Sequence, residues 1–65
     1  MNIYTAIIET PDGRIVKEEF SGYHDPDNAL DDITRYFGAI YPDVNSCVVT
    51  LPDRKEIILW LKKDG

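Results

Sequence analysis

The chain has 65 residues, with 12 acidic against 7 basic side chains and a formal net charge of −5. This length predicts one small domain, residues 1–65, and the surplus of acids argues against direct binding to nucleic acid or to an anionic membrane surface. The only cysteine, Cys47, excludes an intrachain disulfide. Because no apolar run is long enough to span a bilayer and no leader segment is evident, we expect a cytoplasmic protein.

The first two predicted elements are strands at residues 2–10 and 14–21, both rich in β-branched and aromatic residues. Between them lies Pro11-Asp12-Gly13, in which proline suits a type I turn and glycine supplies the left-handed residue of a three-residue hairpin loop. This turn predicts a register in which Thr10 lies opposite Arg14.

A helix is predicted next. Asp25 is a typical N-cap and Pro26 suits the first helical position. Apolar residues then recur at steps of three and four, which indicates a helix with one buried stripe: Ala29, Leu30, Ile33, Phe37 and Ile40. Tyr41-Pro42 is expected to end the helix.

A second hairpin is predicted from residues 45–51 and 55–62, because Pro52-Asp53-Arg54 repeats the first turn code. With Leu51 opposite Lys55, apolar residues of one strand lie opposite apolar residues of the other on the same face of the sheet. This register requires a left-handed backbone at Arg54, at a cost of about 1 kcal/mol relative to glycine.

These elements predict an α+β fold, a single ββαββ domain whose four-stranded sheet is covered by the helix on one face. The first and last strands are apolar on both faces, which is typical of central strands and favours the order 2-1-4-3. An all-antiparallel order 2-1-3-4 is the alternative. The expected inner face comprises Tyr4, Ala6, Ile8, Val16, Phe20, Cys47, Val49, Leu51, Ile57, Leu59 and Leu61.

The opposite face of the sheet has no predicted cover. In the order 2-1-4-3, Ile3, Ile7, Ile58 and Trp60 would form one contiguous apolar patch. Large exposed apolar patches mark partner or dimer surfaces, and tryptophan is a common anchor there. The alternative is that these residues are exposed singly, as in many proteins.

The sequence carries no recognisable catalytic or metal site. Cys47 lies within an apolar strand, where a thiol is usually inert, and His24 precedes the helix without a second catalytic group nearby. No second histidine or cysteine is present for zinc, and no phosphate-binding loop occurs. We therefore expect no enzymatic activity, no metal and no cofactor.

Asp27, Asp31 and Asp32 form an acidic face on the predicted helix. One interpretation is that these carboxylates imitate the phosphates of nucleic acid and meet a basic protein. The other is a solvated helix face with capping acids, which is the usual role of such charges.

The strand and turn at residues 4–13, followed by an acidic helix, resemble the start of HicB-type antitoxins, although the extra strand and Gly-Cys segment of those proteins are missing. The element order is similar to that of very small phage-encoded inhibitors, including some anti-CRISPR proteins and a type of toxin-neutralising protein. This resemblance implies a protein-binding inhibitor of a basic or nucleic-acid-handling partner. The alternatives are a homodimeric structural or regulatory protein and an antitoxin-like neutraliser.

Overall fold

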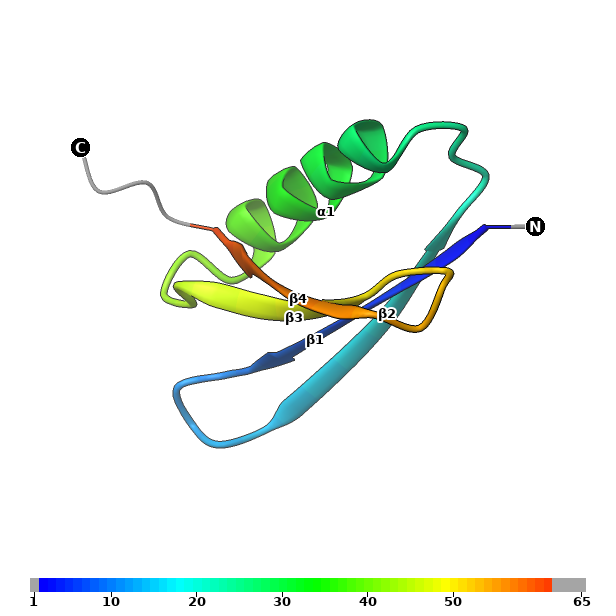
Figure 1. Cartoon of the computed structure of the whole chain (residues 1–65). Helices are drawn as coiled ribbons and strands as arrows, with labels where there is room; N and C mark the ends of the chain where they lie inside the picture. The colour runs from blue at the N-terminus through cyan, green and yellow to red at the C-terminus, as the bar shows by residue number, and fades with distance from the viewer. Residues whose placement is uncertain (1, 62–65) are drawn as a thin grey trace.

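The computed structural model describes residues 2–61. Its elements are β1 (Ile3–Glu9), β2 (Ile15–Ser21), α1 (Pro26–Ile40), β3 (Ser46–Thr50) and β4 (Glu56–Trp60). The helix lies across one face of a four-stranded sheet, and the other face is left open (Figure 1). The predicted α+β class is therefore confirmed. Lys62, which the sequence places in the last strand, lies outside the described residues.

The order of strands in the sheet is β2-β1-β3-β4, and every neighbouring pair is antiparallel. The favoured order 2-1-4-3 is wrong, and the all-antiparallel alternative is the observed one. In both orders β3 runs antiparallel to β1 and β4 runs parallel to it. The orders differ only in whether β3 or β4 lies beside β1. Antiparallel pairing is slightly more stable per residue than parallel pairing, which favours β3 in that place.

The register of the first hairpin is confirmed. Ile8 lies opposite Val16 and Tyr4 lies opposite Phe20. At the turn, the Thr10 N–H donates to the carbonyl of Arg14 at 2.8 Å, and Gly13, with φ of 88°, donates to the carbonyl of Thr10 at 2.9 Å. The proline-aspartate-glycine turn thus sets which side chains of β1 and β2 share a face.

The second hairpin repeats this geometry. The Leu51 N–H donates to the carbonyl of Lys55 at 2.8 Å, and the Arg54 N–H donates to the carbonyl of Leu51 at 2.9 Å. Arg54 has a φ of 73°. Among residues 2–61 it is the only residue other than glycine whose backbone lies in the left-handed region. A carboxylate oxygen of Asp53 accepts from the Lys55 N–H at 3.1 Å and so supports the turn.

Replacing Arg54 with glycine is expected to leave the protein equally stable or to stabilise it by up to about 1 kcal/mol. Glycine removes the steric penalty at positive φ, and its greater freedom in the unfolded chain offsets part of that gain. Chemical denaturation of both proteins measures the difference. A loss of stability greater than about 1 kcal/mol would show that the arginine side chain itself supports the turn.

The helix begins and ends where the sequence predicts. A side-chain oxygen of Asp25 accepts from the Asp27 N–H at 2.9 Å, and Pro26 occupies the first helical turn. At the other end the Tyr41 N–H donates to the carbonyl of Phe37 at 2.8 Å, and the helix continues through Gly38 to Ile40. Within residues 2–61 no helix combines the length and the apolar character needed to cross a bilayer.

The core lies between α1 and the inner face of the sheet. It comprises Tyr4, Ala6, Ile8, Ala29, Ile33, Phe37, Val44, Cys47 and Val49. The remaining residues predicted for the inner face of the sheet are partly buried against this core. Two details differ from the expected core: Ile40 lies on the apolar stripe but is 49% exposed, whereas Val44 in the loop before β3 is buried.

Candidate protein-interaction surfaces

The outer face of the sheet carries an apolar row that crosses three strands. Ile7 of β1 lies opposite Val48 of β3, and Val48 lies opposite Ile58 of β4. Trp60 follows Ile58 by two residues and therefore points to the same face. We call Ile7, Val48, Ile58 and Trp60 the outer patch.

Much of the outer patch is accessible to solvent. Val48 is 38% exposed, Ile58 63% and Trp60 66%, whereas Ile7 is partly buried. The helix covers the opposite face, and no other described element lies over this one (Figure 1). A protein surface that exposes neighbouring large apolar side chains in this way is suited to contact with another protein.

The patch differs from the one expected from the sequence. Val48 is not part of the contiguous patch expected from the order 2-1-4-3, although its position in β3 puts it on the same face as Ile58. Ile3 was included, but β3 pairs with β1 only from Thr5 to Ile7, so Ile3 lies beyond β3 and is separated from Ile7 by Thr5. Both differences follow from the strand order, because β3 lies between β1 and β4.

The acidic face of the helix is exposed at Asp27, Asp31 and Asp32. Arg35, one turn after Asp31, donates to its carboxylate at 2.7 Å. This ion pair offsets part of the negative charge of the face. Tyr23 lies beside Asp32. Desolvation raises the pKa of the Tyr23 phenol, and the neighbouring Asp32 carboxylate raises this pKa further.

The two predicted surfaces lie on opposite sides of the molecule. The acidic residues belong to the helix layer, and the outer patch belongs to the far face of the sheet (Figure 1). A single flat partner surface cannot cover both at once. A partner that contacts both would have to wrap around the edge of the sheet.

The candidate nucleophile and base are not arranged for catalysis. Cys47 is 3% exposed in the core, and burial raises the pKa of its thiol to about 11, so the reactive thiolate is disfavoured. His24 is exposed in the loop before α1. Among residues 2–61 there is no cluster of three histidine, cysteine, aspartate or glutamate side chains that could hold a metal ion.

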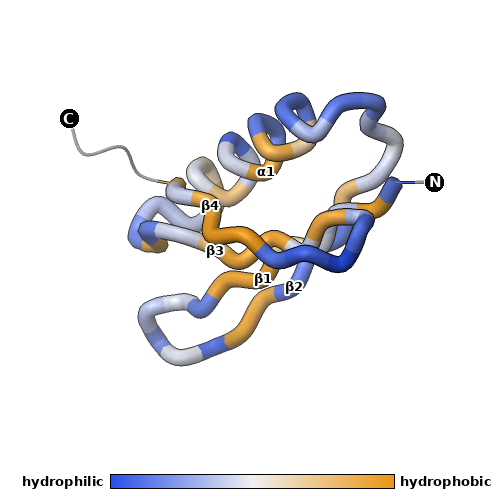
Figure 2. Tube along the Cα trace, viewed as in Figure 1, coloured by the Kyte–Doolittle hydropathy of each residue, from blue (hydrophilic) through white to orange (hydrophobic). Residues whose placement is uncertain are grey.

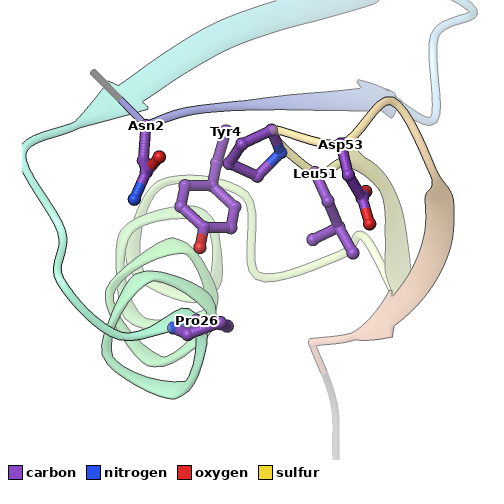
Figure 3. Close-up of a pocket in the computed structure, with 6 residues that line it drawn as sticks. Asn2, Tyr4, Pro26, Leu51 and Asp53 are labelled. Carbon is purple, nitrogen blue, oxygen red and sulfur yellow. The ribbon is translucent and has the colours of Figure 1, made fainter.

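A pocket of about 230 Å³ lies between the start of β1, the first turn of α1 and the β3–β4 turn. Its lining residues are Asn2, Tyr4, Pro26, Leu51, Pro52 and Asp53. Figure 3 shows the Tyr4 side chain reaching from β1 towards Pro26. Pockets for small molecules usually measure about 300–1,000 Å³, and Asp53 is already engaged with the Lys55 N–H. The pocket is therefore smaller than a typical ligand site.

The chain was compared with protein-family models, with curated proteins and with solved structures. None of the three comparisons found a match. The geometry of the described residues is therefore the basis for the functional inference.

Proposed function

We propose that the protein is a non-enzymatic binding module that attaches to a protein partner through the outer patch. The observation that carries this proposal is the exposure of Val48, Ile58 and Trp60 side by side on an uncovered face of the sheet. Burying such side chains against a partner is favourable by roughly 25 cal/mol for each Å² removed from water. Tryptophan in particular is enriched among residues that dominate binding energy.

The charges around the patch favour a basic partner. On the same outer face lie three acids, Glu9 of β1, Glu19 of β2 and Glu56 of β4, and one base, Lys17 of β2, which lies opposite Ile7. The chain as a whole carries a net charge of −5. Acidic groups at the rim of an interface steer a basic partner towards it and discriminate against acidic ones.

A small acidic protein that covers a basic surface would block access of nucleic acid to that surface. We therefore propose an inhibitor of a nucleic-acid-handling protein, of the anti-defence kind encoded by phages and mobile elements. Among residues 2–61 no cluster of three potential metal ligands is present and the Cys47 thiol is buried, which is compatible with action by binding alone.

The test compares proteins retained from a lysate by the immobilised chain and by outer-patch variants. Trp60→Ala is expected to weaken binding of the recovered partner by about 2 kcal/mol or more, roughly 30-fold, because a large apolar anchor is lost. Val48→Lys, which lies away from both sheet edges, should weaken binding similarly by placing a charge in the contact. Titration of the recovered partner measures both effects.

Two control variants separate binding from folding. Thr50→Lys adds the same charge on the same face and strand but outside the apolar row, and it should leave binding nearly unchanged. Leu59→Ala removes a partly buried side chain of the inner face and should reduce stability more than Trp60→Ala does. If Trp60→Ala and Val48→Lys bind the partner as tightly as the unmodified protein, the outer patch is not the binding surface.

A further inference from the structure

The open edge of β4 presents unpaired backbone groups in a regular array. β4 is the last strand of the sheet, and its hydrogen-bonded pairs with the preceding strand include Leu51 with Lys55 and Asn45 with Leu61. Hydrogen-bonded and non-hydrogen-bonded pairs alternate along an antiparallel ladder. The N–H and C=O groups of Ile58 and Trp60 therefore point away from β3, towards the open edge.

The two edges of the sheet differ in how well they are protected. β2 carries Lys17, Glu18 and Glu19 in its middle, and charges on an edge strand discourage pairing with another strand. β4, by contrast, carries a single charge, Glu56 at its first position, and residues 57–61 read Ile-Ile-Leu-Trp-Leu without a charge, proline or glycine. Figure 2 shows this difference as hydrophobic colour along β4 and hydrophilic colour in the middle of β2. An unprotected apolar edge of this kind is a template for strand addition.

We propose that β4 pairs with β4 of a second copy in antiparallel orientation, with Leu59 of both copies on a two-fold axis. Ile58 of each copy then lies opposite Trp60 of the other, and their edge-facing backbone groups complete the ladder. Ile57 lies opposite Leu61 of the second copy on the helix side. The two sheets join into one sheet of eight strands.

Side-chain complementarity selects this register. Every described residue from 57 to 61 lies opposite an apolar residue of the second copy. A pairing centred on Ile58 would instead set Glu56 opposite Trp60 of the second copy. Because directly opposed side chains contribute most to sheet pairing, the register centred on Leu59 is favoured.

The protected edge of β2 is a poor alternative partner for β4. Pairing β4 with β2 of another copy would place apolar side chains beside Lys17 and Glu19, whose backbone groups also face their open edge. Such a head-to-tail contact forms a closed ring only for particular rotations between copies and otherwise leads to a filament. Pairing β4 with itself closes after two copies and leaves only the charged edges of β2 exposed.

The inference goes beyond the proposed function and does not rest on it. In the pair, Ile58 and Trp60 of one copy lie next to Trp60 and Ile58 of the other on the outer face. The two outer patches therefore merge into one surface of twice the size. A binding partner is not required for the pairing itself.

Sedimentation equilibrium of the purified full chain tests the proposal. We expect a mass of two copies at micromolar concentration. Ile58→Pro removes an edge-facing N–H that β3 does not use, and it should weaken self-association at least tenfold. Lys17→Pro makes the equivalent change on the edge of β2 and should leave the association unchanged. Val48→Lys, which disrupts the outer patch away from the edge, should also leave it unchanged.

Cross-linking provides a second readout that does not depend on whether a variant with proline in an edge strand still folds. In the proposed register Leu59→Cys places two thiols in a non-hydrogen-bonded pair with Cα atoms about 4.5 Å apart, which allows a disulfide between copies. Ile57→Cys, on the same face, should not cross-link because it lies opposite Leu61. Both cysteine variants carry Cys47→Ala as well, because Cys47 lies directly opposite Leu59 in the same chain and would otherwise compete for the new thiol. A monomeric mass at several hundred micromolar, or equal cross-linking of the two cysteine variants, would overturn the proposal.

Discussion

Replacing Phe37 with alanine is expected to destabilise the protein by about 3–5 kcal/mol, the usual cost of deleting a buried phenylalanine side chain. Phe37 is fully buried in α1. Its ring lies 6.0 Å from that of Phe20 on β2, 5.4 Å from that of Tyr36 and 6.0 Å from that of Tyr41. The substitution leaves a cavity where the helix contacts the sheet, and it also removes these aromatic pairs.

The size of this loss matters because the domain is small. Native proteins are stable by roughly 0.05–0.15 kcal/mol per residue, which for this chain amounts to about 3–10 kcal/mol in total. Phe37→Ala should therefore leave a large unfolded fraction in water, measured by urea titration followed by circular dichroism. Ile40→Ala on the same helix stripe is the matched control, and it should cost much less because Ile40 is 49% exposed. A loss below 1 kcal/mol for Phe37→Ala would mean that the helix does not pack through this face.

If the helix acids imitate the phosphates of nucleic acid, reversing Asp27, Asp31 and Asp32 to lysine should abolish or strongly weaken binding to a basic partner, whereas a partner held by the outer patch alone should bind unchanged. Each reversal changes the charge by two units, so the net charge of −5 becomes +1. Charges at the rim of an interface act mainly on the association rate and are screened by salt. Affinity of the unmodified protein should therefore fall as salt rises from low to physiological concentration, and the variant should lose this dependence.

The same reversal has a structural cost that must be separated from binding. Asp27 lies in the first turn of α1, where a negative charge near the helix dipole is worth a few tenths to about 1 kcal/mol, and Asp31 loses its contact with Arg35. Thermal denaturation should show a modest loss with the fold retained. A variant with Glu18 and Asp43 reversed adds four charge units outside both the acidic helix face and the outer face of the sheet, and it serves as the control. Equal binding by all three proteins at both salt concentrations would show that the helix acids only cap and solubilise.

Local sequence signals determined the elements and their pairing within each hairpin. The hydrogen bonds of each hairpin turn allow a single register of the flanking strands, at Pro11-Asp12-Gly13 and at Pro52-Asp53-Arg54. The positive φ of Arg54 follows from the register of the second hairpin. Asp25 caps the N-terminus of the helix and Pro26 lies in its first turn, so these two residues set where the helix begins. These features depend on interactions between residues close together in the chain, so the sequence carries them in full.

The sequence also predicted which side chains point to each face of the sheet, because side-chain direction alternates along a strand whichever strands lie beside it. This alternation is why all the inner-face residues predicted from the pattern contribute to the observed core. The same alternation placed Ile7, Ile58 and Trp60 on the outer face.

Only the tertiary structure decided which strand of the second hairpin lies beside β1. Apolar residues on both faces suggested a central position for β4, but its outer side chains Ile58 and Trp60 are in fact exposed at the edge of the sheet. The choice depends on contacts between strands far apart in the chain, and β3 with Val48 is nearly as apolar as β4. Because both placements bury similar side chains, the free-energy difference lies in antiparallel pairing across the whole sheet, which no local pattern in the sequence records.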